Sequence, residues 1–332
     1  MDGTVSTGIS SQNIGFVPGH SIDGKIAILS HGGQSKSPAR KHPILFFHGA
    51  TVPTQFTSEY KIDGVSWMDW NAKEGWASFG FDLPGYGRSD GYRPSTGAVD
   101  PRKYGSSETL MTDIDNCVNH VLKECGCDQL HVVAISRGAI PAGYYASKFP
   151  GKIRSLTFHA PITHKNGVDP AIIEELLGSP EVPKVANFGL SAMDRFHLLE
   201  SDRPDGTTTN LEPSFITDWP RNYGAALAGS SSPELSAEDR KIDTPIGFAV
   251  DIFDAWHGKY FDPAAITMPV LIVRGDWDRF LTPATETQEL FERIASAEKY
   301  YLQMPKSTHS ILFERSRYRM YRAVSDFQAN FD

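Results

Sequence analysis

Short apolar runs recur along the chain, separated by turn-forming or helical stretches. The run Pro43–Phe47 is continuously apolar, which is typical of a strand covered on both faces of a parallel sheet. The stretch Thr109–Lys123 places its apolar residues at helical spacing, and a further helix is expected from about Ile311. Strands alternating with helices predict an α/β fold with a doubly wound, mostly parallel sheet. The predicted strands cover residues 24–29, 43–47, 76–81, 131–136, 153–158, 269–273 and 299–303.

The pattern changes between Ile162 and about Thr267. This stretch holds short helical patterns, such as residues 170–177, together with many turn formers and several large aromatic residues. About 100 residues inserted between two late strands predict a helical cap over the carboxyl ends of the strands, where open α/β sheets bind ligands. We therefore expect a core made of residues 1–162 and 268–332, interrupted by a cap at residues 163–267.

The composition limits the kinds of molecule that the chain is expected to bind. The 332 residues include 32 basic and 40 acidic side chains, and the resulting net charge of −8 argues against nucleic acid or anionic membrane as the main partner. The polar start of the chain lacks the basic region and apolar run of a signal peptide, and no stretch reaches the length of a membrane span. We expect a soluble, cytoplasmic protein that acts on a small molecule; a homodimer is left open.

The cysteines do not predict a disulfide framework or a metal site. Cys117, Cys125 and Cys127 form an odd, low count. The Cys-x-Cys pair has no nearby histidines or further cysteines to complete a tetrahedral set of ligands. We interpret all three as ordinary thiols, and we expect no metal.

Candidate chemistry begins at Ser136. The apolar strand from His131 ends at this serine, and Arg137–Ala142 then looks like the opening of a helix. A serine between a strand and a helix, with small neighbours, is typical of the sharp turn called a nucleophile elbow, normally Gly-x-Ser-x-Gly. Ala134 replaces the first glycine, and Gly138 supplies the second.

An activated serine requires a base and an acid that orients the base, and in this architecture they follow in the order Ser, Asp or Glu, His. Asp278 follows the apolar strand that ends near Val273, and His309 follows the last predicted strand. Ser136, Asp278 and His309 are therefore the predicted triad. Asp276 is the competing acid, because on a turn either carboxylate could face the histidine.

Acyl transfer also requires donors for the developing oxyanion. The backbone N–H groups of Ala50, after His48-Gly49, and of Arg137, after the nucleophile, are the natural pair. We expect His48 to support this loop and Asp82 to hold its own turn by hydrogen bonds. For the Arg137 side chain we expect a salt bridge under the cap, and projection into the pocket is the alternative. The remaining histidines without such a context are expected to be structural or surface groups: His42, His120, His131, His159, His164 and His257.

Along nearly its whole length, the chain resembles the α/β-hydrolase superfamily, in its capped serine-hydrolase branch. The residues that carry the resemblance are His48–Ala50, Asp82–Ser89, Ala134–Gly138, Gly275–Asp278 and Thr308–His309. The resemblance implies an α/β-hydrolase fold, the same triad and oxyanion hole, and no cofactor. A serine at the elbow separates the chain from the dehalogenase and epoxide-hydrolase branches, which have an aspartate there.

These observations predict a serine hydrolase that cleaves an ester, lactone or thioester through an acyl-enzyme. The aromatic residues of the insertion suggest a moderately large apolar or aromatic substrate. One alternative is carbon–carbon bond cleavage or cyclisation of a polyketide-like or β-diketone substrate by the same triad. Another is a non-catalytic receptor that uses the capped pocket. The candidate substrate contacts are His48, Thr51, Trp219, Phe253 and Trp256.

Overall fold

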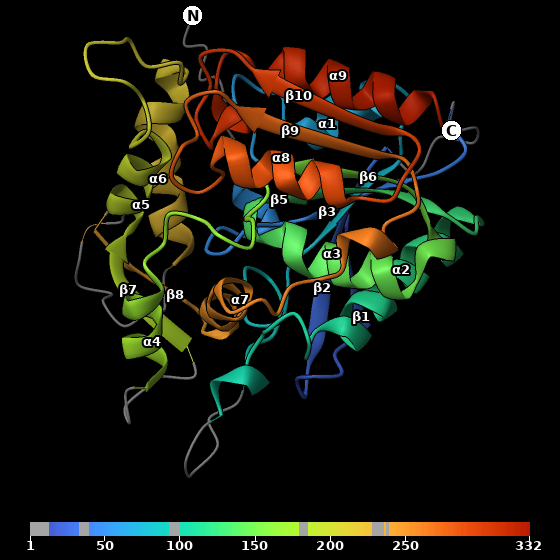
Figure 1. Ribbon diagram of the computed structural model, residues 1–332, viewed down its shortest axis with the longest axis horizontal. Helices are drawn as coiled ribbons and strands as arrows, with labels where there is room; N and C mark the ends of the chain where they lie inside the picture. The colour runs from blue at the N-terminus through green and yellow to red at the C-terminus, as the bar shows by residue number, and fades with distance from the viewer. Residues whose placement is uncertain (1–12, 33–39, 93–99, 179–184, 228–235, 237–238) are drawn as a thin grey trace, which may run out of the picture.

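The computed structural model describes residues 13–32, 40–92, 100–178, 185–227, 236 and 239–332. Within these ranges eight strands form one sheet in the order β1-β2-β4-β3-β5-β6-β9-β10 (Figure 1). Strand β2 pairs antiparallel with both β1 and β4, and the pairs from β4 to β10 are parallel. The strands are β1 (Ile14–Pro18), β2 (Lys25–His31), β4 (Ser78–Phe81), β3 (Ile44–Phe47), β5 (Leu130–Ile135), β6 (Ile153–His159), β9 (Val270–Gly275) and β10 (Lys299–Met304).

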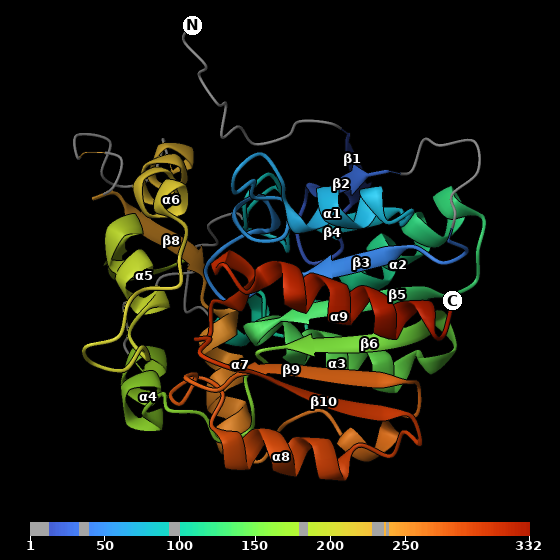
Figure 2. The same ribbon diagram turned by 90° about the horizontal axis from the view of Figure 1, so that it is seen from above.

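Helices cover both faces of this sheet, which explains why its central strands are apolar throughout. In β5, Val132 and Ala134 pack into the core on one face, while Val133 and Ile135 pack into the core on the other. The first core includes side chains of α2 (Met111–Cys125), α3 (Ala139–Lys148) and α8 (Ala284–Arg293). The second core includes side chains of α1 (Trp67–Lys73) and α9 (Arg317–Ala329), which lie in front of the sheet in Figure 2. This is the α/β arrangement that the sequence predicts.

Residues 163–267, here called the inserted segment, connect β6 to β9. The segment contains an antiparallel pair of strands, β7 and β8, which the sequence pattern did not predict. In both views α4, α5 and α6 lie beyond the end of the large sheet toward which its parallel strands point (Figure 1, Figure 2). The elements are α4 (Pro170–Gly178), β7 (Val185–Ser191), α5 (Ala192–Leu199), α6 (Pro213–Ala226), β8 (Lys241–Pro245) and α7 (Gly247–Trp256).

One strand and one helix start differ from the sequence prediction. Strand β1 lies inside the polar start of the chain, where only its backbone pairing with β2 identifies it. The last helix begins at Arg317 rather than near Ile311, because residues 311–313 form a short 3-10 turn that closes the loop carrying His309. Among the described residues, no helix combines the length and apolarity needed to cross a membrane.

A cluster of charged side chains joins the end of β2 to α1. His31 ends β2, is 3 % exposed, and places Nδ1 3.1 Å from Asp69 Oδ1 and Nε2 3.7 Å from Glu59 Oε1. Burial by itself lowers the pKa of His31, but hydrogen bonds and charge from Asp69 and Glu59 outweigh burial and raise it to about 9. The imidazolium is therefore the stabilising form.

We expect His31→Gln to lower the free energy of unfolding by about 2 kcal/mol near neutral pH. Because the folded-state pKa is raised above the ordinary value of 6.5, the contribution is complete below that value and disappears as the pH rises through about 9. Urea unfolding of both proteins from about pH 6 to pH 10 measures this difference. The matched control, His120→Gln, loses a surface pair with Glu124 and should cost less than about 0.5 kcal/mol. A deficit in His31→Gln that stays constant with pH would contradict the assignment.

Candidate active site

Ser136 occupies a strained turn between β5 and α3. Its φ of 55° lies in the left-handed region, which costs a non-glycine residue about 1–3 kcal/mol unless its surroundings impose it. Residues 136–138 form a single 3-10 turn before α3 begins at Ala139. The side chain stays partly exposed while its strand is buried. This is the strand–turn–helix geometry that exposes a nucleophile at the end of a parallel sheet.

Two glycines allow the loop after β3 to lie against this turn. A Cβ on Gly138 would lie 2.6 Å from the His48 carbonyl oxygen and 2.9 Å from that of Phe47, closer than real side chains approach. A Cβ on Gly49 would lie 3.4 Å from Ser136 Cβ. Ala134, by contrast, points its methyl group into the core beneath the sheet, where a side chain fits. The turn at Ser136 therefore needs a glycine at position 138 but not at position 134.

The structure brings Ser136, His309 and Asp278 into one hydrogen-bonded chain. His309 Nε2 lies 2.8 Å from Ser136 Oγ, and His309 Nδ1 lies 2.7 Å from Asp278 Oδ2. His309 is 9 % exposed and Asp278 is fully buried. A carboxylate at Nδ1 favours the tautomer in which Nδ1 carries the proton and Nε2 accepts from the serine hydroxyl.

Asp278 is kept ionised by its partners. Burial by itself raises the pKa of this carboxyl, but the charge of His309 and its hydrogen bond, with the hydrogen bonds from the Thr282 hydroxyl and backbone N–H, outweigh burial and hold it below its ordinary value. The ionised form can therefore accept the Nδ1 proton of His309 near neutral pH.

Asp276, the competing acid, has a different contact. Its Oδ1 accepts a hydrogen bond of 3.1 Å from the backbone N–H of Ser307, two residues before His309. A Cβ on Gly275 would lie 2.2 Å from the Ser307 carbonyl oxygen, so this glycine permits the close approach of the two loops. Buried Glu314, which the sequence did not single out, accepts from both the N–H and the hydroxyl of Thr308 at 2.7 Å. These contacts position the loop that presents His309.

His48 supports the loop that follows β3. Its ring is 1 % exposed, Nε2 accepts a 3.0 Å hydrogen bond from Leu83 N–H, and Nδ1 lies 2.9 Å from the Gly49 carbonyl oxygen. Burial lowers its pKa to about 3, so the ring is neutral. Asp82 accepts from the backbone N–H groups of Thr54 and Arg88, as the sequence predicts. Both side chains tie the loop after β3 to the turn after β4.

A cavity of about 30 Å³ opens at Ser136 and His309. Arg195 of α5 lies in its wall, and its Nε donates a 2.9 Å hydrogen bond to Thr51 Oγ1. The sequence contained no signal for Arg195, because its position depends on how the inserted segment folds. The described residues lining this cavity are Gly49, Ala50, Val52, Thr57, Ile135, Ser136, Arg195, His309, Ser310, Leu312 and Phe313.

The aromatic candidates lie elsewhere. Trp219 is fully buried, and its indole N–H donates to the Phe56 carbonyl oxygen at 3.1 Å. Phe253 and Trp256 pack against a separate apolar cluster that includes Ile140 and Ile162. Of the predicted site residues outside the triad, Ala50 lines this cavity. Thr51 does not line it but bonds to Arg195, which does. The three aromatic side chains are not part of this lining.

The Arg137 side chain forms the expected salt bridge. It is fully buried, with Nε 2.8 Å and Nη2 2.5 Å from Asp251 Oδ2 on α7. Asp251 also accepts hydrogen bonds from the N–H and hydroxyl of Ser107, at 2.7 and 2.8 Å. The side chain of the residue next to Ser136 is thus bound to α7 of the inserted segment.

A family model described as "Serine aminopeptidase, S33" matches residues 65–316, which is more than half of the chain. The chain belongs to the S33 family. Its fold and family together make it an α/β hydrolase. A curated relative, a "Probable lysophospholipase BODYGUARD 2" from Arabidopsis thaliana, is 31% identical over 159 residues. That match covers 47% of this chain and 31% of the relative, so the chain spans about a third of that protein's length.

Solved structures share the fold of this S33 member. A monoglyceride lipase from Saccharomyces cerevisiae, solved with a substrate analogue, has a TM-score of 0.64 at 16% identity, covering 98% of this chain and 97% of the lipase. A monoacylglycerol lipase from Paleococcus ferrophilus has a TM-score of 0.58 at 18% identity, covering 92% and 99%. At these identities the likeness shows the fold alone.

We expect Asp251→Asn to lower the free energy of unfolding by about 3 kcal/mol, because it leaves the buried Arg137 guanidinium without a countercharge. Asp254→Asn, on the same helix, removes pairs with the more exposed Arg102 and Lys259 and should cost less than about 1 kcal/mol. Urea unfolding measures both variants. Equal losses would show that the Arg137 pair contributes no more than a surface pair.

Proposed function

We propose that the chain is a serine carboxylic ester hydrolase in which Ser136 is the nucleophile, His309 the base and Asp278 the acid. The observation that carries the proposal is the continuous chain of hydrogen bonds, 2.8 and 2.7 Å long, that starts at a serine in a strained turn. Serine hydroxyls are weak nucleophiles, and an imidazole within hydrogen-bond distance activates them.

The geometry supports an acyl-enzyme mechanism. As Ser136 Oγ attacks the carbonyl carbon, its proton passes to His309 Nε2, and Asp278 stabilises the imidazolium through Nδ1. His309 then gives the proton to the leaving alcohol, and the C–O bond breaks to leave the acyl group on Ser136. Water attacks this ester in the same way, with His309 as base. This sequence requires no cofactor.

We assign the oxyanion hole to the backbone N–H groups of Ala50 and Arg137. The close approach of Gly49 to Ser136 and of Gly138 to the His48 carbonyl supports this, because the loop that carries Ala50 lies against the turn that carries Arg137. The salt bridge between the Arg137 side chain and Asp251 restricts the movement of the Arg137 backbone. Donors fixed in advance stabilise the oxyanion without reorganisation.

An ester substrate fits this site better than a peptide with a free amino terminus. An aminopeptidase must bind a substrate ammonium group, whereas the cavity has the cation of Arg195 and, among its described lining residues, no carboxylate. Apolar side chains such as Val52, Leu312 and Phe313 suit an acyl chain. The lysophospholipase relative and the monoacylglycerol lipase neighbour are named for substrates with an ester-linked acyl chain.

We propose that the inserted segment is the cap of this site. A cavity of about 30 Å³ holds little more than one small group, whereas ligand pockets typically measure roughly 300–1,000 Å³. Among the described residues, movement of α5, which carries Arg195, away from the loop at Thr51 would enlarge this cavity for a moderately large substrate. Binding of the predicted moderately large apolar or aromatic substrate depends on this opening.

Ser136→Ala should lower kcat for aryl esters by at least about 10³-fold and abolish fluorophosphonate labelling. Asp278→Asn should lower kcat by about 10³- to 10⁴-fold, because the amide favours the wrong tautomer of His309. Asp276→Asn is the matched control: it retains an oxygen for Ser307 N–H, and its kcat should fall less than about tenfold. A larger loss in Asp276→Asn than in Asp278→Asn would reverse the assignment of the acid, and unchanged labelling of Ser136→Ala would exclude the nucleophile.

We also expect Arg195 to bind an anionic or carbonyl group of the substrate. Arg195→Ala should lower kcat/KM for a lysophospholipid by about 10- to 100-fold, the value of a charge-assisted hydrogen bond, and change it little for a neutral monoacylglycerol. Arg221→Ala, an exposed arginine on α6, controls for the net charge. Equal losses on the two substrates would show that Arg195 does not distinguish them.

A further inference from the structure

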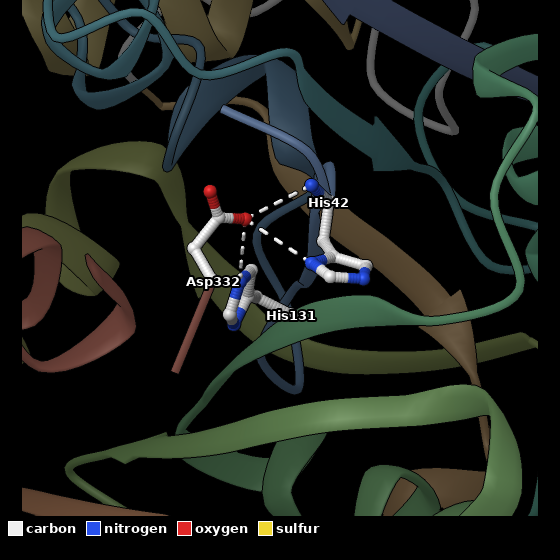
Figure 3. Close-up of side chains that lie close together, drawn as sticks. All are labelled: His42, His131 and Asp332. Atoms are coloured by element: carbon white, nitrogen blue, oxygen red, sulfur yellow. Dashed lines mark hydrogen bonds and ion pairs between the residues drawn. The ribbon is translucent and has the colours of Figure 1, made fainter. Parts of the chain in front are cut away.

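A second cluster of titratable side chains lies far from Ser136. His42 precedes β3, His131 is the second residue of β5, and Asp332 follows α9; their side chains converge in Figure 3. His131 lies five residues before Ser136, so the cluster is roughly 17 Å away along β5, at the opposite end of the parallel strands. None of the chemistry proposed for Ser136 uses this cluster.

The three side chains present one donor atom each to a common point. His42 Nδ1 lies 3.1 Å and His131 Nε2 3.7 Å from Asp332 Oδ1, and all three atoms lie within 4.8 Å of one another. The backbone N–H groups of Lys41 and His42 each donate a 3.0 Å hydrogen bond to this carboxylate and fix its orientation. The ring of His131 is fully buried and that of His42 nearly so.

His131 Nε2 has no hydrogen-bond partner, although it is buried and directed at the carboxylate. The other ring nitrogen, Nδ1, lies 2.7 Å from Ser155 Oγ on β6. When Nδ1 donates to this hydroxyl, the lone pair of Nε2 faces a negatively charged oxygen, which is unfavourable. A bound cation between Nε2 and Asp332 Oδ1 would remove this conflict.

We propose that His42 Nδ1, His131 Nε2 and Asp332 Oδ1 form a binding site for a divalent transition-metal ion of the Zn²⁺ type, with water as a fourth ligand. Imidazole and carboxylate donors suit Zn²⁺, whose ligand bonds of about 2.0–2.1 Å imply tetrahedral ligand separations of roughly 3.3 Å. The separations of 3.1 and 3.7 Å to Asp332 Oδ1 need only small adjustments. Ser155 corresponds to the outer partner that metal-bound histidines typically have.

The position of the site gives it a structural role. It joins the segment before β3, the start of β5 and the residues after α9, three parts of the chain distant in sequence. An ion bound there would stabilise the folded state, because the unfolded chain does not hold the three donors together. It would leave ester hydrolysis at Ser136 unaffected, so the site does not depend on the proposed function.

The test uses the full chain after EDTA treatment and dialysis, with ZnCl₂ as the probe. Isothermal titration should show one Zn²⁺ per chain, and the Tm should rise by about 4 °C at a free Zn²⁺ concentration roughly 100-fold above the Kd. Asp332→Asn, which keeps an oxygen for the backbone N–H groups, should lose both effects while retaining its kcat. Ser155→Ala should weaken Zn²⁺ binding about 10- to 100-fold.

His164→Ala is the matched control, because His164 lies near Glu286 and Glu289 in a more exposed group of similar composition. It should leave the Zn²⁺-dependent rise in Tm unchanged. A wild-type chain without stoichiometric Zn²⁺ binding would overturn the proposal. So would binding that is lost in His164→Ala and kept in Asp332→Asn. If Asp332→Asn lowers Tm equally with and without Zn²⁺, the three side chains are a structural hydrogen-bond cluster.

Discussion

The left-handed backbone of Ser136 is the constraint on which the rest of the site depends. A non-glycine residue adopts φ of 55° at a cost, and the neighbouring packing imposes it here. Strand β5 is locked between β3 and β6, and Gly138 lies too close to the Phe47 and His48 carbonyl oxygens to admit any side chain. The chain must therefore turn sharply at Ser136, and that turn directs the hydroxyl away from the sheet toward His309.

The inserted segment contacts the surroundings of Ser136 in two places. Asp251 on α7 neutralises Arg137, the residue that follows Ser136, inside the protein. Arg195 on α5 closes the cavity above Ser136 and is held by Thr51, beside the loop that carries Ala50. The inserted segment thus contributes both the buried partner of Arg137 and part of the wall of the cavity at Ser136. Opening the wall at α5 need not disturb the anchor on α7, because different helices carry them.

The strands, and the meeting of Ser136, Asp278 and His309, could be predicted from the sequence. Parallel strands bring the residues that follow them to one edge of the sheet. Apolar runs identify buried strands whatever their neighbours, so the sheet and its two helical layers followed from the sequence. Strand β1 could not, because an exposed edge strand has no apolar run and depends on backbone pairing with β2. The partners Asp251 and Arg195 could not be predicted either, since they depend on the tertiary path of the insertion.

Residue types alone also mislead at specific positions. Trp219, Phe253 and Trp256 are large and aromatic, yet they pack into apolar clusters and do not line the cavity described at Ser136. His42 and His131 carry no local motif, and only the folding of three distant segments places them around Asp332. Such features follow from packing geometry, which the order of residues along the chain does not reveal.

The most direct test of acyl transfer at Ser136 is intact-protein mass spectrometry during turnover of a slowly hydrolysed aryl ester. We expect a transient adduct with the mass of the acyl group, and peptide mapping that places it on Ser136. Turnover without any adduct, together with incorporation of solvent deuterium at a substrate carbon, would contradict the acyl-enzyme mechanism.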